Sequence, residues 1–383
     1  MSTRLGDPID KRIPWVRRID ALEEARAVGS AGPRLTALRR AGERLGDALR
    51  NGPRVVSVRT LPLRTVLYPM KHAFNGAVPL PFPFILFYHR CLLVQVLSDG
   101  RIRNVLWNPT DTEASKQTPF FKNLIDKFGE RAANLLSTEA GTVESQLAKL
   151  GLSPGEIDLI AFDHFHTQDL RPALGTVAPD AEGNRLPARF PNAYLLAPKR
   201  EWHDWDDLHP LQRTWFVADG KRGVPADRVV LFDADVALGD GCLVLRTHGH
   251  TTGNHTIFCH TDGGVFGCSE NGTSADNWSP HESRIPGLRR YVKHYGLEVV
   301  LNSNTPELGA EQYTSMILER TVVDRVPDRP AFVQMFPSSE VVPSAIAPGV
   351  RPSMVFHHRT SGTVQLDRPA AQTEQQRASA MRQ

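Results

Sequence analysis

The chain has 383 residues, enough for one large domain or two ordinary ones. Apolar residues make up 40% and charged residues 23%, which is typical of a globular protein in water. The net charge of only +3 argues against a dedicated nucleic-acid-binding protein. The longest apolar run, residues 77–88, contains three prolines and falls short of the roughly 20 residues that a membrane span needs.

Two further features bear on the cellular compartment. The first residues, MSTRLGDPIDKR, are charged but are followed by no apolar core, so we do not expect a secretory signal. The four cysteines, Cys91, Cys242, Cys259 and Cys268, are scattered and form no CxxC pair. This pattern favours reduced thiols over a disulfide framework, and we predict a cytoplasmic protein.

Residues 1–54 are predicted to form a helical extension. They hold twelve Lys/Arg against seven Asp/Glu, so this region alone is more basic than the whole chain. Leu35, Leu38, Leu45 and Leu49 repeat at helical spacing with charged residues between them. We expect an amphipathic helix that packs on the main domain; a docking surface for an anionic partner is the alternative.

The rest of the chain is predicted to be one domain over residues 55–325, followed by an irregular or disordered tail over residues 326–383. Residues 54–108 are rich in Val, Ile, Leu and aromatics, and the Asp99-Gly100 pair is typical of a tight hairpin turn. Residues 120–150 show helical spacing, residues 242–270 predict three strands, and residues 297–301 predict another buried strand. Beyond residue 325 prolines recur, and the last fifteen residues are polar without periodicity.

The most informative stretch is residues 157–169, IDLIAFDHFHTQD. An apolar run leads into His164 and His166, and side chains two apart in a strand lie on the same face. Both imidazoles are therefore expected to leave the end of a buried strand together, where one metal ion can bind both. Asp169 follows in the turn, whereas Asp163 is expected on the opposite face as a structural partner.

A third histidine has a matching position. His250 lies in THGHTTGNH between two predicted strands, and Gly249 allows a sharp turn just before it. Three imidazoles and a water form a recurring catalytic zinc site, in which the metal lowers the pKa of the water to about 7. The residues thus predict a metal-dependent hydrolase.

Aromatic residues cluster between these histidines. Trp202 and Trp205 lie three apart on a predicted helix, and Trp215-Phe216 follows. This spacing is typical of core packing. The alternative is an apolar wall of a substrate pocket, with Trp202 as a substrate-binding residue.

In these motifs the chain resembles the metallo-β-lactamase superfamily, and within it the N-acyl homoserine lactonase group. The matching segments, in order over residues ~55–310, are LGLSPGEIDLIAFDHFHTQD, FPNAYLLAPKREW, THGHTTGNHTIF, GGVFGCSENG and VVLNSN. The resemblance implies an α/β (α+β) fold, a four-layer αββα sandwich with its metal site at one edge. It also implies that His164, His166 and His250 bind the first metal.

The second metal site of this family is altered here. The family pattern HxHxDH has Gln168 and Asp169 at its last two positions, and Asn304 stands where the family has its final histidine. The bridging acid corresponds best to Glu270, with Ser269 or Cys268 as other registers. Because amide oxygens bind transition metals weakly, the resemblance favours one ion, with Asp169 as general base. The alternative is a two-metal site in which Asp169 is a ligand and Glu270 bridges.

Further site residues follow from the same comparison of motifs. Asn304 is expected to line the substrate site, and Gln168, His248 and His255 to support the ligands rather than bind the metal. The predicted cofactor is Zn²⁺, with iron or manganese as alternatives, and the predicted substrate is a small ester or lactone with an apolar portion. A homodimer is possible, and the sequence does not decide the oligomeric state. Two other functions also stay open: a non-catalytic accessory protein of this fold, and iron-dependent oxygen or sulfur chemistry.

Overall fold

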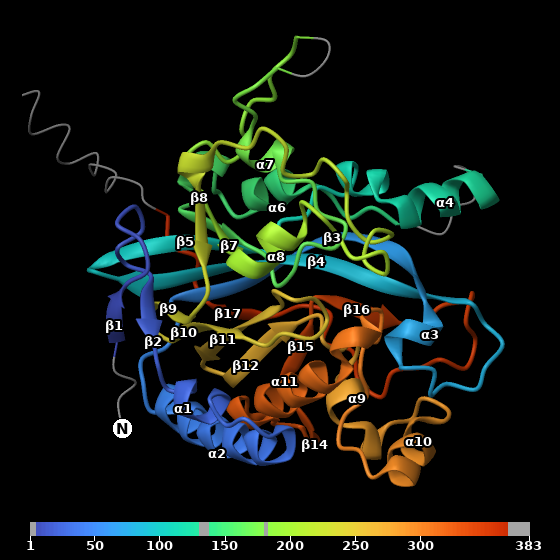
Figure 1. The fold of residues 1–383 in the computed structure, drawn as a ribbon. Coiled ribbons are helices and arrows are strands. Elements are labelled where there is room, and N and C mark those ends of the chain that lie inside the picture. Colours follow the sequence, from blue (N-terminus) through green and yellow to red (C-terminus); the bar gives the residue numbers. More distant parts are fainter. Residues whose placement is uncertain (1–4, 130–137, 180–182, 367–383) are drawn as a thin grey trace, which may run out of the picture.

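Two β-sheets packed face to face and covered by helices on both outer sides make up the protein (Figure 1). The computed structural model describes residues 5–129, 138–179 and 183–366. Buried side chains fill the space between the sheets, among them Val94, Trp107, Val244 and Phe266. This helix–sheet–sheet–helix order confirms the predicted four-layer αββα architecture. None of the helices in the described ranges has the length and apolar character needed to cross a bilayer.

The first sheet has eight strands. Their order is β17-β3-β4-β5-β6-β7-β8, and β16 pairs with β4. The bounds are β3 Ser57–Pro69, β4 Phe84–Ser98, β5 Arg101–Trp107, β6 Leu159–Ala161, β7 Tyr194–Pro198, β8 Val229–Phe232, β16 Ser339–Val342 and β17 Thr360–Gly362. Asp99 and Gly100 join β4 to β5 with φ angles of 50° and 72°, which confirms the predicted tight turn.

The second sheet has seven strands in the order β1-β2-β9-β10-β11-β12-β15. The bounds are β1 Leu5–Pro8, β2 Arg17–Ile19, β9 Asp235–Gly239, β10 Cys242–Arg246, β11 His255–Thr261, β12 Gly264–Ser269 and β15 Met335–Pro337. A separate hairpin consists of β13 Arg325–Val326 and β14 Arg329–Val333. The three strands predicted over residues 242–270 are confirmed as β10, β11 and β12.

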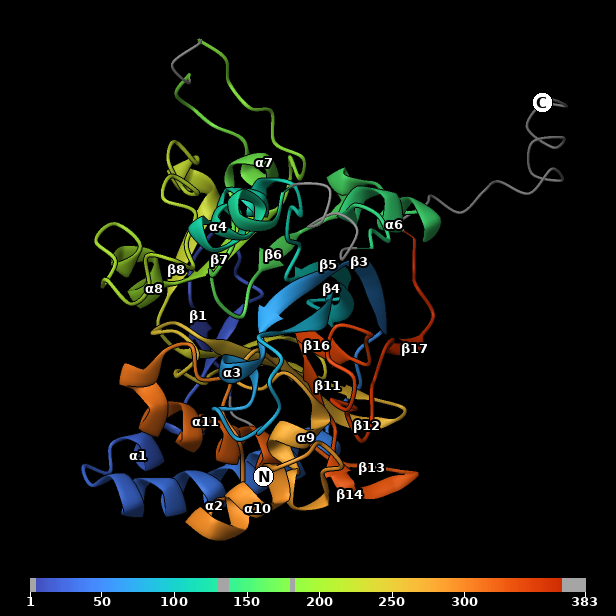
Figure 2. The same ribbon diagram turned by 90° about the vertical axis from the view of Figure 1, so that its right-hand side faces the viewer.

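Helices form the two outer layers (Figures 1 and 2). The first sheet is covered by α4 Pro119–Phe128, α6 Val143–Lys149, α7 Arg171–Leu174 and α8 Lys199–Asp204. The second is covered by α1 Glu23–Arg26, α2 Ala31–Arg50, α9 Ala275–Trp278, α10 Leu288–Tyr295 and α11 Gly309–Val322. The short α3 Met70–Ala73 follows β3. Part of the predicted helical region, residues 130–137, lies outside the described residues.

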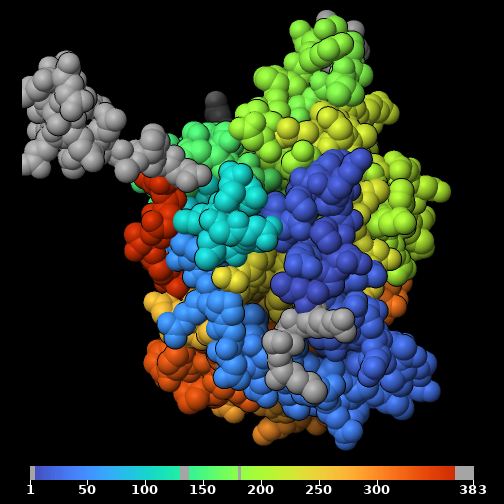
Figure 3. Space-filling model, turned by 90° about the vertical axis from the view of Figure 1, so that its left-hand side faces the viewer, coloured from blue at the N-terminus to red at the C-terminus, as the bar shows by residue number. Residues whose placement is uncertain are grey.

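The N-terminal region contributes more than a helix. As predicted, α2 buries Leu38, Leu45 and Leu49 against the domain. The sequence did not predict β1 and β2, which extend the second sheet through pairing of β2 with β9. Figure 3 shows this segment, in blue, running along one face beside the β4–β5 hairpin in cyan. Residues 5–54 are therefore partly built into a sheet.

The C-terminal region and residues 297–301 also differ from expectation. Where we expected an irregular tail, residues 326–366 contain β14, β15, β16 and β17; residues 367–383 lie outside the described residues. The strand predicted at residues 297–301 is absent, although Val299 and Val300 are buried. The backbone there bonds to loops instead: the N–H of Val300 donates to Asn277 and that of Asn302 to Asn271. The apolar run at residues 297–301 is therefore a buried loop and not a strand.

A buried ion pair fixes the C-terminal segment to the first sheet. Arg90 of β4 donates to Glu340 of β16 at 2.8 Å, and their side chains are 1% and 0% exposed. Arg90 also donates to the carbonyl of Pro337, and Glu340 accepts from the backbone N–H of Phe356. Both charges are therefore surrounded by partners, as buried charges require.

We expect Glu340→Leu to lower the free energy of unfolding by about 3–5 kcal/mol, because Arg90 is left as an unpaired buried charge. The double variant Arg90→Met/Glu340→Leu is expected to recover part of this loss. Urea unfolding measures both, with Glu113→Leu at an exposed ion pair as the control. A double variant no more stable than Glu340→Leu would contradict this reading.

Candidate metal centre

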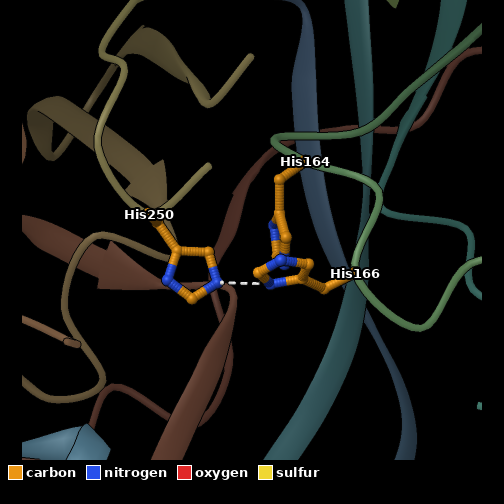
Figure 4. Close-up of side chains that lie close together, drawn as sticks. All are labelled: His164, His166 and His250. Carbon is orange, nitrogen blue, oxygen red and sulfur yellow. Dashed lines mark hydrogen bonds between the residues drawn. The ribbon is translucent and has the colours of Figure 1, made fainter. Parts of the chain in front are cut away.

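Three histidines from two loops come together at one edge of the sandwich (Figure 4). His164 and His166 lie in the loop between β6 and α7, and His250 lies in the loop between β10 and β11. One ring nitrogen from each residue lies within 4.8 Å of the others, and all three residues are buried. The predicted convergence is confirmed.

The predicted local reason for this convergence was wrong. Strand β6 ends at Ala161, so strand alternation does not set the direction of His164 and His166. A loop with Thr167 at a φ of 63° places them instead. Gly249 has the expected role: its φ is 148°, and a Cβ there would lie 2.1 Å from the Cα of Gln312.

Asp163 orients the first histidine. Its Oδ1 lies 2.6 Å from His164 Nδ1, and its Oδ2 accepts from the Ser338 hydroxyl. The carboxylate holds the proton of His164 on Nδ1, so the lone pair of this ring is on Nε2. The expectation that Asp163 faces away from the site was therefore wrong, because the chain has left the strand before this residue.

Gln212 orients the second histidine. Its Nε2 donates to Glu307 at 2.9 Å and to Thr305 at 3.2 Å, so its Oε1 is the atom that faces His166. His166 Nε2 donates to this oxygen over 2.9 Å. The lone pair of His166 is thereby on Nδ1, directed at His250.

The spacing of the ligand atoms suits a tetrahedral ion. His166 Nδ1 and His250 Nε2 are 3.2 Å apart (Figure 4). Two nitrogens bound tetrahedrally at the usual zinc distance of 2.0–2.1 Å lie about 3.3 Å apart. Because the tautomers of His164 and His166 and the spacing of this one pair agree with a shared cation, the residues fit a bound metal ion.

Burial keeps two of the three rings uncharged. It lowers the pKa of His166 and of His250 well below the ordinary value, and the neighbouring His164 lowers both further. For His164 burial acts in the same direction, but the charge and hydrogen bond of Asp163 outweigh it, and the net pKa is raised. Neutral His166 and His250 have lone pairs available to a metal at physiological pH.

Several predicted residues line the cavity that contains the histidines. They are Glu270, Asn304 and Gln168. Asn304 Nδ2 lies 3.3 Å from His166 Nδ1, and Gln168 donates to the backbone carbonyl of His166. Glu270 accepts from the Ser339 backbone N–H, and burial raises its pKa to about 8. These residues surround the cluster as the sequence predicted; their individual roles stay predictions.

The remaining predicted residues lie away from the cavity wall. Asp169 is bound through both carboxylate oxygens by Arg171. The rings of His248 and His255 meet edge to face with their centroids 5.8 Å apart, and burial lowers the pKa of His248 to about 4. Trp202 packs beside Phe165 with Lys221 over its ring. The roles given to these residues also stay predictions.

Other aromatic residues form the apolar wall of the cavity. They are Tyr68, Phe87, Phe120, Phe121 and Trp215. Tyr68 stacks on Phe87 at 4.2 Å, and Phe120 lies 5.0 Å from Trp215. The sequence pointed to Trp202 because it adjoins a family-like motif, whereas Phe120 and Phe121 belong to α4, far away in the chain.

Sequence reasoning gave no role to Glu201, although its carboxylate links the two ligand loops. Glu201 lies on α8 and is 0% exposed. Its Oε1 accepts from the backbone N–H of Phe165 at 2.8 Å, and its Oε2 accepts from the Thr251 hydroxyl at 2.9 Å. Because Phe165 stands between His164 and His166 and Thr251 follows His250, one side chain anchors all three ligands.

A second buried carboxylate supports the loop of His250 from the other side. Glu319 of α11 accepts from Asn271, Trp278 and Thr256 at 2.7–2.8 Å. Asn271 in turn accepts from the backbone N–H of His250 at 3.0 Å. The ligand loop is therefore fixed to a helix of the outer layer.

No family model and no curated protein matches this chain. Similar solved structures include a probable metal-dependent hydrolase from Staphylococcus aureus, 16% identical over 68% of this chain and 82% of that one, with a TM-score of 0.47. A dizinc quorum-quenching lactonase is 12% identical over 82% and 99%, with a TM-score of 0.45. An N-acyl homoserine lactone lactonase is 15% identical over 64% and 90%, with a TM-score of 0.42.

Glu201→Ala is expected to weaken zinc binding about 10- to 100-fold, because the ligand loops lose their shared anchor. Competition with a chromophoric chelator measures the affinity. Glu311→Ala, at an exposed position on α11, is the matched control. Unchanged zinc affinity in a folded Glu201→Ala variant would show that the loops hold the ligands without it.

Glu319 should make stability depend on pH. Burial raises its pKa from 4.5 to about 7, so between these values the unfolded chain loses a proton that the folded protein keeps. Its contribution to stability is therefore present below pH 4.5 and lost as the pH rises through 7. Relative to Glu319→Gln, metal-free wild type should lose on the order of 3 kcal/mol between pH 4.5 and 8. Urea unfolding measures the free energy of unfolding of both proteins. A difference between them that stays constant from pH 4.5 to 8 would contradict the raised pKa of Glu319.

Proposed function

We propose that this protein is a metal-dependent hydrolase in which His164, His166 and His250 hold one divalent ion. The observation that supports this most strongly is the convergence of one ring nitrogen from each of these buried histidines within 4.8 Å of the others, with two of the nitrogens 3.2 Å apart. In the metal-free protein one proton between His166 Nδ1 and His250 Nε2 satisfies this contact, and a bound cation would take its place. A bound ion also leaves a position open for water, as in catalytic three-histidine sites.

The ion we propose is zinc. Zinc prefers neutral imidazoles as ligands. Iron and manganese can bind the same three imidazoles, but with less preference for them. When bound, such an ion supplies an acidic water and stabilises the oxyanion of the substrate. The protein provides the lone pairs, fixed by Asp163 and Gln212.

We propose one ion rather than two. Among the described residues, the histidine trio is the one group of three or more His, Cys, Asp or Glu side chains close enough to share a metal. Asp169 is paired with Arg171, and Asn304 offers an amide at the position of a further ligand. A two-metal site would need Asp169 to leave Arg171.

Glu270 is the acid that we propose receives the proton of the attacking water. Two acids line the cavity, and Asp163 is engaged with His164 and Ser338. Glu270 is held through the Ser339 backbone N–H, and its burial strengthens it as a base. A divalent ion bound beside it would keep the carboxylate ionised and ready to take the proton. Asp169 was predicted for this task, but its ion pair with Arg171 leads us to prefer Glu270.

The proposed substrate is an ester or lactone with an apolar portion. Attack by a metal-activated water suits such carbonyl compounds. The aromatic wall described above offers a surface for the apolar part, in particular Trp215, which lies 6.0 Å from the His166 ring. A non-catalytic accessory role and iron-dependent chemistry remain the competing functions.

The test is metal content and hydrolysis measured together. Purified wild type should bind one equivalent of zinc and cleave members of an ester and lactone panel. His250→Ala should bind less than about a tenth as much and lose at least about 100-fold in kcat/KM, because two imidazoles hold the ion poorly. His294→Ala, at an exposed position on α10, is the control.

Each competing function has its own result. Two equivalents of zinc would favour the two-metal site. A metal-bound protein that cleaves no member of the panel would favour the accessory role. Iron rather than zinc in protein purified without added metal would favour iron-dependent oxygen or sulfur chemistry.

A further inference from the structure

The cavity beside the histidines contains polar atoms that the described residues leave without hydrogen-bond partners. One of them, His250 Nδ1, belongs to the histidine trio itself. The others are His89 Nε2, Thr110 Oγ1 and Asn304 Oδ1, all buried, in residues that line the cavity. A buried polar atom without a partner costs about 1–3 kcal/mol unless a ligand or a water satisfies it. One such atom has little meaning, but three around one cavity point to a polar group that binds there.

His89 is the best defined of the three. It lies on β4, where it is the register partner of Arg64 on β3 and of Ser339 on β16. Its Nδ1 is 3.0 Å from the Ser339 hydroxyl. One ring nitrogen is thus occupied by the protein, and the other is left for a ligand.

The surroundings of Ser339 indicate where the proton of His89 lies. The side chain of Ser339 hydrogen-bonds the Glu270 carboxyl, whose Oε2 also accepts the Ser339 backbone N–H. With a divalent ion bound at the histidines Glu270 would be ionised, so the Ser339 hydroxyl directs its proton to that carboxylate and accepts a hydrogen bond from His89 Nδ1. The lone pair of His89 is then on Nε2.

From this geometry we infer that His89 is a substrate-binding residue whose Nε2 accepts a hydrogen bond from a hydroxyl or amide N–H near the scissile carbonyl. This inference rests on the proposed hydrolase function and narrows its substrate class. The substrate would present an apolar part to the aromatic wall and a hydrogen-bond donor to His89.

Two observations are consistent with this role. Burial lowers the pKa of His89 to about 4, so the ring is neutral and accepts at physiological pH. His89 also lies outside the trio that can share a metal, which leaves its lone pair for an organic ligand. A specific acceptor gives selectivity, because a substrate without the donor leaves a buried nitrogen unpaired.

Two hydroxamates test this inference without requiring turnover. Acetohydroxamate and N-methylacetohydroxamate both chelate zinc through two oxygens, but only the first has an N–H. Zinc-loaded wild type should bind acetohydroxamate about 3- to 10-fold more tightly, the range expected for one hydrogen bond. Calorimetry on wild type, His89→Phe and His89→Gln measures this preference.

His89→Phe should lose the preference while keeping one equivalent of zinc, and His89→Gln, which retains an acceptor, should keep part of it. N-methylacetohydroxamate could also bind more weakly because its methyl group is too large for the site. Such a steric preference for acetohydroxamate would persist in His89→Phe, whereas a preference due to the hydrogen bond would not. His294→Phe, at an exposed position, should behave as wild type.

The hydrolysis data separate this inference from the proposed function. Among substrates that the wild type cleaves, the ratio of kcat/KM for a 2-hydroxy ester to kcat/KM for the matched ester without the hydroxyl should fall about 3- to 10-fold in His89→Phe. If the wild type cleaves no ester, the hydrolase proposal fails and the hydroxamate preference still decides the role of His89. Equal preferences in wild type and zinc-loaded His89→Phe, or none in wild type, would overturn the inference.

Discussion

The structure depends on the convergence of three buried histidine rings from two loops. His166 Nδ1 and His250 Nε2 lie 3.2 Å apart, and His164 completes the group. Packing forces this approach, since one loop belongs to each sheet and the apolar interior holds the sheets together. Glu201 on one side and Glu319 on the other then fix the loops through buried hydrogen bonds.

Several parts of the fold and of the site could be predicted from the sequence, because they depend on residues that are close together in the chain. The Asp99-Gly100 turn follows from the backbone angles that a two-residue hairpin requires, and the apolar spacing of α2 from its buried face. The histidines were found from their motifs. Their convergence was predicted correctly although the proposed strand ends at Ala161, because any tight connection after β6 delivers side chains to the same sheet edge.

Other features depend on tertiary contacts that a sequence pattern does not encode. Gln212 orients the site from a segment with no recognisable motif, and nothing in FPNAYLLAPKREW indicates that Glu201 joins the two ligand loops. Glu270 and His89 meet through Ser339, which lies in the region expected to be irregular. The edge strands β1 and β2 are short and polar, so their pairing with β9 gives no periodic signal. The sequence of the buried loop at residues 297–301 resembles that of a strand, because apolar residues are needed wherever the chain is buried, whether or not it forms strand hydrogen bonds.

X-ray absorption at the zinc edge of the metal-loaded protein tests the central claim most directly. One ion held by three imidazoles and a water predicts four nitrogen or oxygen neighbours at about 2.0–2.1 Å, with outer scattering from three imidazole rings. Fewer imidazoles, a sulfur neighbour near 2.3 Å, or a second metal about 3.5–4 Å away would contradict the account.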